Sequence, residues 1–252
     1  FDLQRYNQTF ASDQAPNPIQ ENSWLGESQS TDIQDPWLME LYQFSISRHW
    51  GASGTVQITG PLVPSMANNL SAMEIQLLQT VTDSGETDSI DYSAYAELMQ
   101  PGGYYLNGVF QADTNKMYLQ ASHNLRFPYD SDAPSQLQGE LILRLPNAIE
   151  SRNIMLDQLG NQTAGLGMII SYTGIARGSI DIQIQGDRNK LVAIDILDEF
   201  DNFIGTQTHI SKIEDSDLWN AQIRFNGIAH KAIIYQASKQ DMVKIPFSFE
   251  GL

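Results

Sequence analysis

A short acidic stretch, residues 196–209 with the sequence ILDEFDNFIGTQTH, holds the side chains best suited to binding a cation. Asp198, Glu199 and Asp201 lie within four residues of one another, and carboxylate oxygens are ligands that Ca²⁺ prefers. A helix–loop–helix calcium site also needs acids at alternating positions, a glycine among them and a glutamate at the end of the loop. Here Gly205 comes too late and no glutamate closes the stretch, so these three acids are a candidate calcium site of a non-standard kind.

The same stretch has the composition of a tight turn between two strands. Asp, Asn and Gly dominate tight turns because they tolerate left-handed backbone conformations and hydrogen-bond their own main chain. Apolar and polar residues alternate on both sides of it, in residues 192–198 and 202–208. The sequence therefore favours the tip of a β-hairpin over a metal loop. This layout resembles hairpins of bacterial extracytoplasmic immunoglobulin-like domains, a resemblance confined to residues 196–209 that implies no particular function.

Motifs for other chemistry are missing from the chain. Without cysteine there are no thiol nucleophiles, thiolate metal sites or disulfides. No two histidines have a zinc-binding spacing, and neither a G-x-S-x-G elbow nor a phosphate-binding glycine loop is present. A carboxylate pair for glycoside hydrolysis depends on the fold and not on spacing, and the sequence leaves it open. We predict a protein that is not an enzyme and carries no cofactor, with calcium as the one ion for which it offers candidate ligands.

Aromatic side chains near turns form a second group of candidate ligand-binding residues. Tyr104 and Tyr105 fall on opposite faces of an alternating segment, so one of the two rings is expected to face outward. Trp50 and Tyr129 flank turns. An exposed ring can stack on the face of a sugar while neighbouring amides bond its hydroxyls, whereas the same ring in a core only packs. Tyr104, Trp50 and Tyr129 are therefore candidates for binding a glycan, with core packing as the alternative.

The charge of the chain limits its partners. Its 30 acidic residues against 14 basic ones give a net charge of −16. Nucleic-acid binding depends on Lys and Arg that displace counterions from phosphates, and anionic membrane surfaces also attract basic residues. No apolar run reaches the roughly 18 residues of a membrane-spanning segment. We therefore expect neither nucleic-acid binding nor membrane insertion, and instead a protein partner or self-assembly, with a glycan as the alternative.

Period-two alternation of apolar and polar residues is the main structural signal. In residues 179–186, for example, Ile180, Ile182 and Ile184 share one face and polar residues the other. Alternating segments rich in β-branched and aromatic residues and bounded by turn residues predict strands. They are residues 54–60, 72–81, 91–99, 103–112, 116–127, 139–146, 167–174, 179–186, 190–198, 202–211, 218–227, 230–238 and 243–252. Strands at this spacing favour antiparallel sandwiches or barrels.

Two segments carry helix signals, and one carries a boundary signal. Asp35 and Pro36 form a helix start ahead of the apolar residues 37–44, while residues 147–160 fit either a short helix or a pair of strands. The proline- and serine-rich residues 127–136 form the best domain boundary. We predict an all-β chain with at most one or two short helices. An irregular N-terminal arm (residues 1–35) precedes two antiparallel β-sandwich domains, immunoglobulin-like or jelly-roll-like (residues 36–130 and 131–252).

The polar N-terminal arm carries four aromatic residues as candidates for partner docking, Phe1, Tyr6, Phe10 and Trp24. Such a segment either wraps a neighbouring domain or docks into another subunit. Because the numbering starts at a phenylalanine and not at a methionine, we expect the original start to have been removed. The arm, the strand pattern and the missing catalytic motifs favour a non-enzymatic extracytoplasmic protein, in the periplasm, on the cell surface or secreted. It would act by surface contacts in an envelope, cell-surface or appendage assembly. A carbohydrate-binding module is the alternative, and a phage or virion structural component is a further one.

Overall fold

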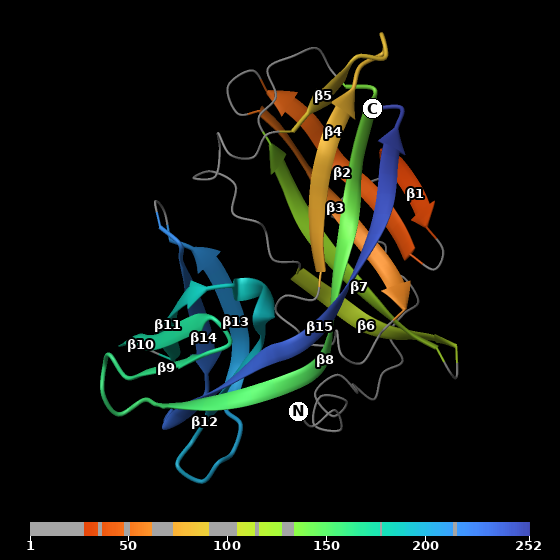
Figure 1. Ribbon diagram of the computed structural model, residues 1–252. Coiled ribbons are helices and arrows are strands. Elements are labelled where there is room, and N and C mark those ends of the chain that lie inside the picture. Colours follow the sequence, from red (N-terminus) through yellow and green to blue (C-terminus); the bar gives the residue numbers. More distant parts are fainter. Residues whose placement is uncertain are drawn as a thin grey trace. The chain divides into compact units, whose positions relative to one another are not determined.

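The computed structural model of the chain describes residues 28–34, 37–47, 51–61, 73–90, 105–113, 116–127, 134–176, 178–213 and 216–252. Strands make up most of these ranges, and the strand pairings described are antiparallel. The all-β, sandwich-like fold predicted from period-two alternation is thereby confirmed (Figure 1). Within the same ranges, no helix is long and apolar enough to cross a lipid bilayer.

The strands form three five-stranded sheets. The first has the order β1 (Ser30–Gln34), β2 (Trp37–Ser47), β3 (Gly51–Pro61), β7 (Lys116–Phe127) and β6 (Tyr105–Asp113). The second has the order β13 (Gly205–Lys212), β14 (Leu218–Phe225), β11 (Ser179–Gly186), β10 (Met168–Ala176) and β9 (Gln162–Gly165). The third has the order β12 (Leu191–Leu197), β15 (Lys231–Glu250), β8 (Gln136–Met155), β4 (Met73–Val81) and β5 (Thr87–Ser89).

Two long strands are shared by two compact units of the chain. β8 and β15 each run for 20 residues. The boundary between the units crosses β8 after Leu143 and β15 after Asp241. The final residues, Met242–Leu252, therefore belong to the first unit together with β1–β7. This boundary differs from the one at residues 127–136 that composition suggested, and the independent folding of each unit as a domain stays a prediction.

The first unit has a core between two sheets. The first sheet faces β4, β5 and the adjoining parts of β8 and β15 (Figure 1). Met39 and Leu41 on β2 and Leu137 on β8 are fully buried. The ring of Phe247 on β15 lies over Gly139 of β8, where a Cβ atom would come within 2.6 Å of it. A glycine at this position thus makes room for an aromatic ring on the neighbouring strand.

The second unit has a core of aliphatic side chains. Its two layers are the second sheet and a layer of β12 with the adjoining parts of β8 and β15. Ile180, Ile182 and Ile184 of β11 are fully buried, which confirms the face predicted for them. They cluster with buried residues of β8, β10, β12, β14 and β15. Side chains from both layers therefore build one core.

The helix predicted to start at Asp35 and Pro36 is not formed, and in residues 147–160 the helix alternative is not the one adopted. The residues after the helix start at 35–36 form β2, in which Trp37, Met39 and Leu41 are buried and the residues between them are partly buried. β2 pairs with β1 on one side and with β3 on the other, and these pairings outweigh a local start signal. In residues 147–160, β8 continues as a strand to Met155. The strand alternative therefore holds for most of that segment.

Candidate functional site

Most of the residues proposed for ligand or partner binding lie outside the described ranges. They are the candidate glycan-binding residues Tyr104, Trp50 and Tyr129 and the aromatic residues of the arm, Phe1, Tyr6, Phe10 and Trp24. Their roles stay predictions. The described residues include a groove in the first unit and, in the second unit, the acidic turn and a group of exposed apolar loop residues.

The carboxylate of Asp198 organises the acidic turn. Its Oδ1 accepts hydrogen bonds from the backbone N–H groups of Phe200 and Asn202, each at 2.9 Å, and its Oδ2 accepts one from Asn202 Nδ2 at 3.0 Å. Leu197 and Phe203 pair across the turn, which confirms that it is a tight turn. The chain does not continue as the second strand of a long hairpin, because the following residues form β13 in the other sheet of the unit.

Asp201 ties the turn to the start of β15. Its backbone is left-handed (φ 65°), a conformation that aspartate tolerates. Its Oδ1 lies 2.6 Å from Nζ of the partly buried Lys231. Among the described residues, no three or more His, Asp or Glu side chains are placed to hold a metal ion. The geometry therefore gives no support to calcium binding by Asp198, Glu199 and Asp201, since two of these carboxylates already have partners within the chain.

The turn is expected to loosen at acidic pH. Hydrogen bonds from the Asn202 side chain, and then from backbone N–H groups, hold the pKa of Asp198 below its ordinary value of 3.8. A lowered pKa stabilises the folded turn above about pH 3.8, and this contribution is lost as pH falls to the lowered pKa. We expect the Phe200 and Asn202 amide protons to exchange faster below that pH, after correction for intrinsic rates and relative to amides of β11. Nuclear magnetic resonance would measure this. Asp198→Asn should show no such increase in exchange at low pH. An equal increase in that variant would contradict the role given to the Asp198 carboxylate.

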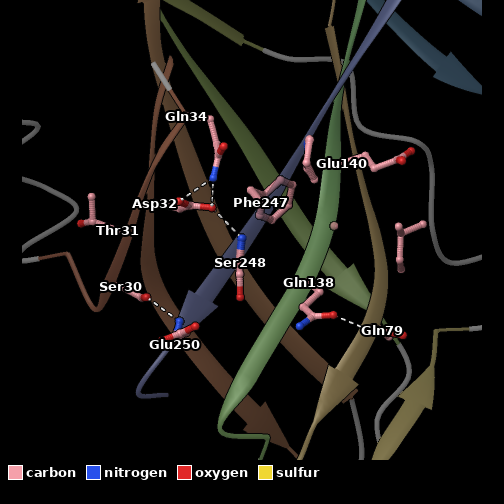
Figure 2. Close-up of a pocket in the computed structure, with 13 residues that line it drawn as sticks. Ser30, Thr31, Asp32, Gln34, Gln79, Gln138, Glu140, Phe247, Ser248 and Glu250 are labelled. Carbon is pink, nitrogen blue, oxygen red and sulfur yellow. Dashed lines mark hydrogen bonds between the residues drawn. The ribbon is translucent and has the colours of Figure 1, made fainter. Parts of the chain in front are cut away.

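The first unit contains an open groove of about 750 Å³ (Figure 2). β1 forms one side of it, and β4, β8 and β15 form the other. Hydroxyl groups line it together with three glutamines (Gln34, Gln79, Gln138) and three acids (Asp32, Glu140, Glu250). The lining can therefore donate and accept several hydrogen bonds.

Side chains of β1 cap the free edge of β15 along this groove. Asp32 Oδ2 accepts a hydrogen bond from the Ser248 N–H at 2.7 Å, and Ser30 Oγ accepts one from the Glu250 N–H at 2.9 Å (Figure 2). Two residues earlier, the same edge carries Pro246, which has no N–H to satisfy. Because outward-facing N–H groups recur at every second residue, these three positions leave no donor for an incoming strand. The N–H groups of this stretch are thus capped, which makes it a poor site for β-strand addition.

The groove has the chemistry of a polar binding surface. Glu140 pairs with Lys244 Nζ at 2.7 Å, and Gln138 is hydrogen-bonded to Gln79. The one aromatic residue of the lining, Phe247, is buried, so its ring offers no stacking surface. Amides, hydroxyls and carboxylates without an exposed ring can bind a polyhydroxylated ligand only through hydrogen bonds.

Asp32→Ala is expected to lower the free energy of unfolding by about 1–2 kcal/mol, because it leaves the Ser248 N–H without its acceptor at a partly buried site. The Ser248 amide proton should lose protection against hydrogen exchange by a comparable free energy. Thr31→Ala, at the exposed neighbouring position of β1, is the matched control and should change stability by less than about 0.5 kcal/mol. Unchanged protection of Ser248 in Asp32→Ala would show that the edge has another cap.

Three large apolar side chains stand exposed on two adjacent loops of the second unit, and we call them the loop patch. Phe200 is 76% exposed, Phe203 42% and Ile228 85%. The loops are residues 198–204, between β12 and β13, and residues 226–230, between β14 and β15. A backbone hydrogen bond from Asn226 N to Ile204 O, at 3.0 Å, joins the two loops, and one from His230 N to Leu197 O, at 2.8 Å, joins the second loop to the end of β12.

Sequence reasoning missed the loop patch, although a signal for it exists. Tight turns favour Gly, Asn, Asp, Ser and Pro. These two loops, DEFDNF and NGIAH, also carry large apolar residues, namely Phe200 and Phe203 in the first and Ile228 in the second. A phenylalanine at the tip of an acidic turn has no core to enter. The nearness of the two loops, however, depends on the pairing of β12 with β15 and of β13 with β14, which the sequence does not specify.

Comparisons with protein-family models, with curated proteins and with solved structures found no match for this chain.

Proposed function

We propose that this protein acts without catalysis, by binding another protein through the loop patch, as a component of an extracytoplasmic surface, envelope or appendage assembly. The observation that carries the proposal is the grouping of Phe200, Phe203 and Ile228 on two hydrogen-bonded loops. Single exposed apolar residues are ordinary on protein surfaces, whereas a group of them rimmed by polar residues is typical of an interaction site.

Energetics also favour a contact role for these residues. Full burial of a phenylalanine or isoleucine side chain contributes roughly 1.5–3 kcal/mol. The free chain gains little of this from Phe200 and Ile228, which are 76% and 85% exposed, and only part of it from Phe203, which is 42% exposed. Loops that project from a rigid sandwich are a frequent place for binding residues, because the sheets fix their positions. The strongest contacts in protein interfaces commonly come from buried aromatic residues. The location outside the cytoplasm is part of the proposal, and an acidic, cysteine-free chain is compatible with it.

The test compares two triple variants of the full chain. The patch variant carries Phe200→Ser, Phe203→Ser and Ile228→Ser. The control carries Met155→Ser, Leu159→Ser and Ile169→Ser, which remove three exposed apolar side chains from other segments of the same unit. Cross-linking in the native source followed by purification should recover a specific protein with the wild type and the control, but not with the patch variant.

Sedimentation of the purified proteins distinguishes self-assembly from a different partner. If the wild type and the control associate and the patch variant does not, the partner is a second copy of the chain. Recovery of the same protein by the wild type, the control and the patch variant alike would contradict the proposal, because the contact would not then depend on the loop patch.

Carbohydrate binding is a second candidate function, favoured by the amides, hydroxyls and carboxylates of the groove in the first unit. A glycan array with the wild type and with Gln138→Ala tests it. We expect a bound glycan to be lost or weakened by about tenfold in Gln138→Ala, because one good hydrogen bond to a ligand is worth about that factor. Absence of any glycan signal from the wild type would remove this candidate.

A further inference from the structure

The tip of the acidic turn presents Phe200 in a fixed position. The Phe200 N–H donates to Asp198 Oδ1, and Asn202 donates to both oxygens of the same carboxylate. The Asp201 carboxylate pairs with Lys231, which joins the turn to β15. The chain is therefore held on both sides of the exposed ring, by Asp198 within the turn and by the Asp201–Lys231 ion pair to β15. Only the two side-chain torsions of Phe200 remain to be ordered when a partner binds, so little conformational entropy is lost.

The charges around the ring select the partner. In residues 198–204 and 226–231, Asp201 is paired with Lys231, so the carboxylates of Asp198 and Glu199 remain as excess negative charge. The whole chain carries a net charge of −16. A partner with Lys or Arg beside apolar side chains would gain both burial of Phe200 and attraction to these carboxylates, whereas an acidic partner would be repelled.

Building on the proposed function, we propose that Phe200 is the anchor of the loop patch and that it packs against a basic protein segment, one in which Lys or Arg flanks apolar side chains. Phe203 and Ile228 then border the buried ring and exclude water from it. Insertion of the same ring into a lipid bilayer is the competing outcome. Carboxylates on either side of Phe200 disfavour it, because anionic headgroups repel them.

The experiment uses the purified full chain and a phage-displayed library of random dodecapeptides. We expect selection on the wild type to enrich sequences that combine Lys or Arg with apolar residues. A synthetic enriched peptide should bind Phe200→Ser at least about tenfold more weakly than the wild type, as expected for loss of a buried aromatic anchor. Leu159→Ser, which removes an exposed apolar side chain elsewhere in the unit, should bind the peptide like the wild type.

Two further measurements separate the parts of the proposal. Asp198→Ala removes the bonds that hold the turn but no apolar contact, so it should weaken peptide binding less than Phe200→Ser does. Raising the salt concentration should slow association, because the attraction between carboxylates and a basic peptide is screened. Vesicles of phosphatidylcholine with and without phosphatidylserine should not bind the protein.

Each contrary result overturns the inference in a recognisable way. Failure to enrich any peptide, enrichment of acidic or uncharged peptides, or equal binding by Phe200→Ser would reject a basic segment anchored on Phe200. Vesicle binding that is lost in Phe200→Ser would reassign the ring to a membrane. If peptides depend on Phe203 and Ile228 but not on Phe200, the inference fails while the proposed function stands. If binding depends on none of the three, both fail.

Discussion

Replacing Phe249 with alanine is expected to lower the free energy of unfolding of the first unit by about 3–5 kcal/mol. Phe249 is fully buried, and the centroid of its ring lies 5.1 Å from that of Phe247, on the same face of β15. Truncation removes the transfer free energy of the ring and leaves a cavity that the surrounding strands fill only in part. The loss falls on the first unit because Met242–Leu252 belong to it, although they end the chain.

Urea unfolding combined with hydrogen exchange and mass spectrometry would locate this loss. Protection should fall in β2, β4 and the last part of β15, and change much less in β11 and β14 of the second unit. Phe200→Ala is the matched control, since it makes the same substitution at a ring that is 76% exposed. Its effect should stay within about 0.5 kcal/mol. If the two variants were equally stable, the C-terminal strand would not complete the core of the first unit.

The fold class could be predicted because burial in a half-exposed sheet has a period of two. In β11 the buried isoleucines alternate with partly exposed residues, as the sequence indicates. The same signal gave a wrong strand boundary where a strand is exposed to water on both faces. Residues 239–241 read Lys-Gln-Asp and suggested a break between two strands, yet β15 continues through them as one strand. Polar side chains do not interrupt a strand whose two faces are both accessible to water.

Partners of strands could not be predicted, and the candidate site depends on them. Alternation gives the face that a residue occupies but not the strand that it pairs with. The acidic turn follows from Asp198, Asn202 and their local hydrogen bonds, so its sequence was sufficient. The loop patch needs Phe200 and Ile228, nearly thirty residues apart in the sequence, to lie on neighbouring loops. Long-range pairing of this kind leaves no local sequence signal.

The core of the second unit gives the other large effect. Ile182→Asn is expected to lower its free energy of unfolding by about 4 kcal/mol or more, because the loss of a buried aliphatic side chain adds to the cost of an amide without partners. Ile182 lies on β11, between Tyr172 of β10 and Ala221 of β14, and all three are buried in one cluster. That cluster is made almost entirely of hydrocarbon side chains, so the new amide would find few hydrogen-bonding groups there.

Gln183→Asn is the control that makes this result specific to one face of the strand. Gln183 is the next residue of β11 and is only partly buried, on the opposite face of the sheet. Its replacement by another amide should cost less than about 1 kcal/mol, measured by the same urea unfolding. A large difference between these neighbouring positions is the result expected for a strand with one dry and one wet face. Similar losses at Ile182 and Gln183 would mean that both faces of β11 are buried, and the loops of the second unit would then project from a differently layered core.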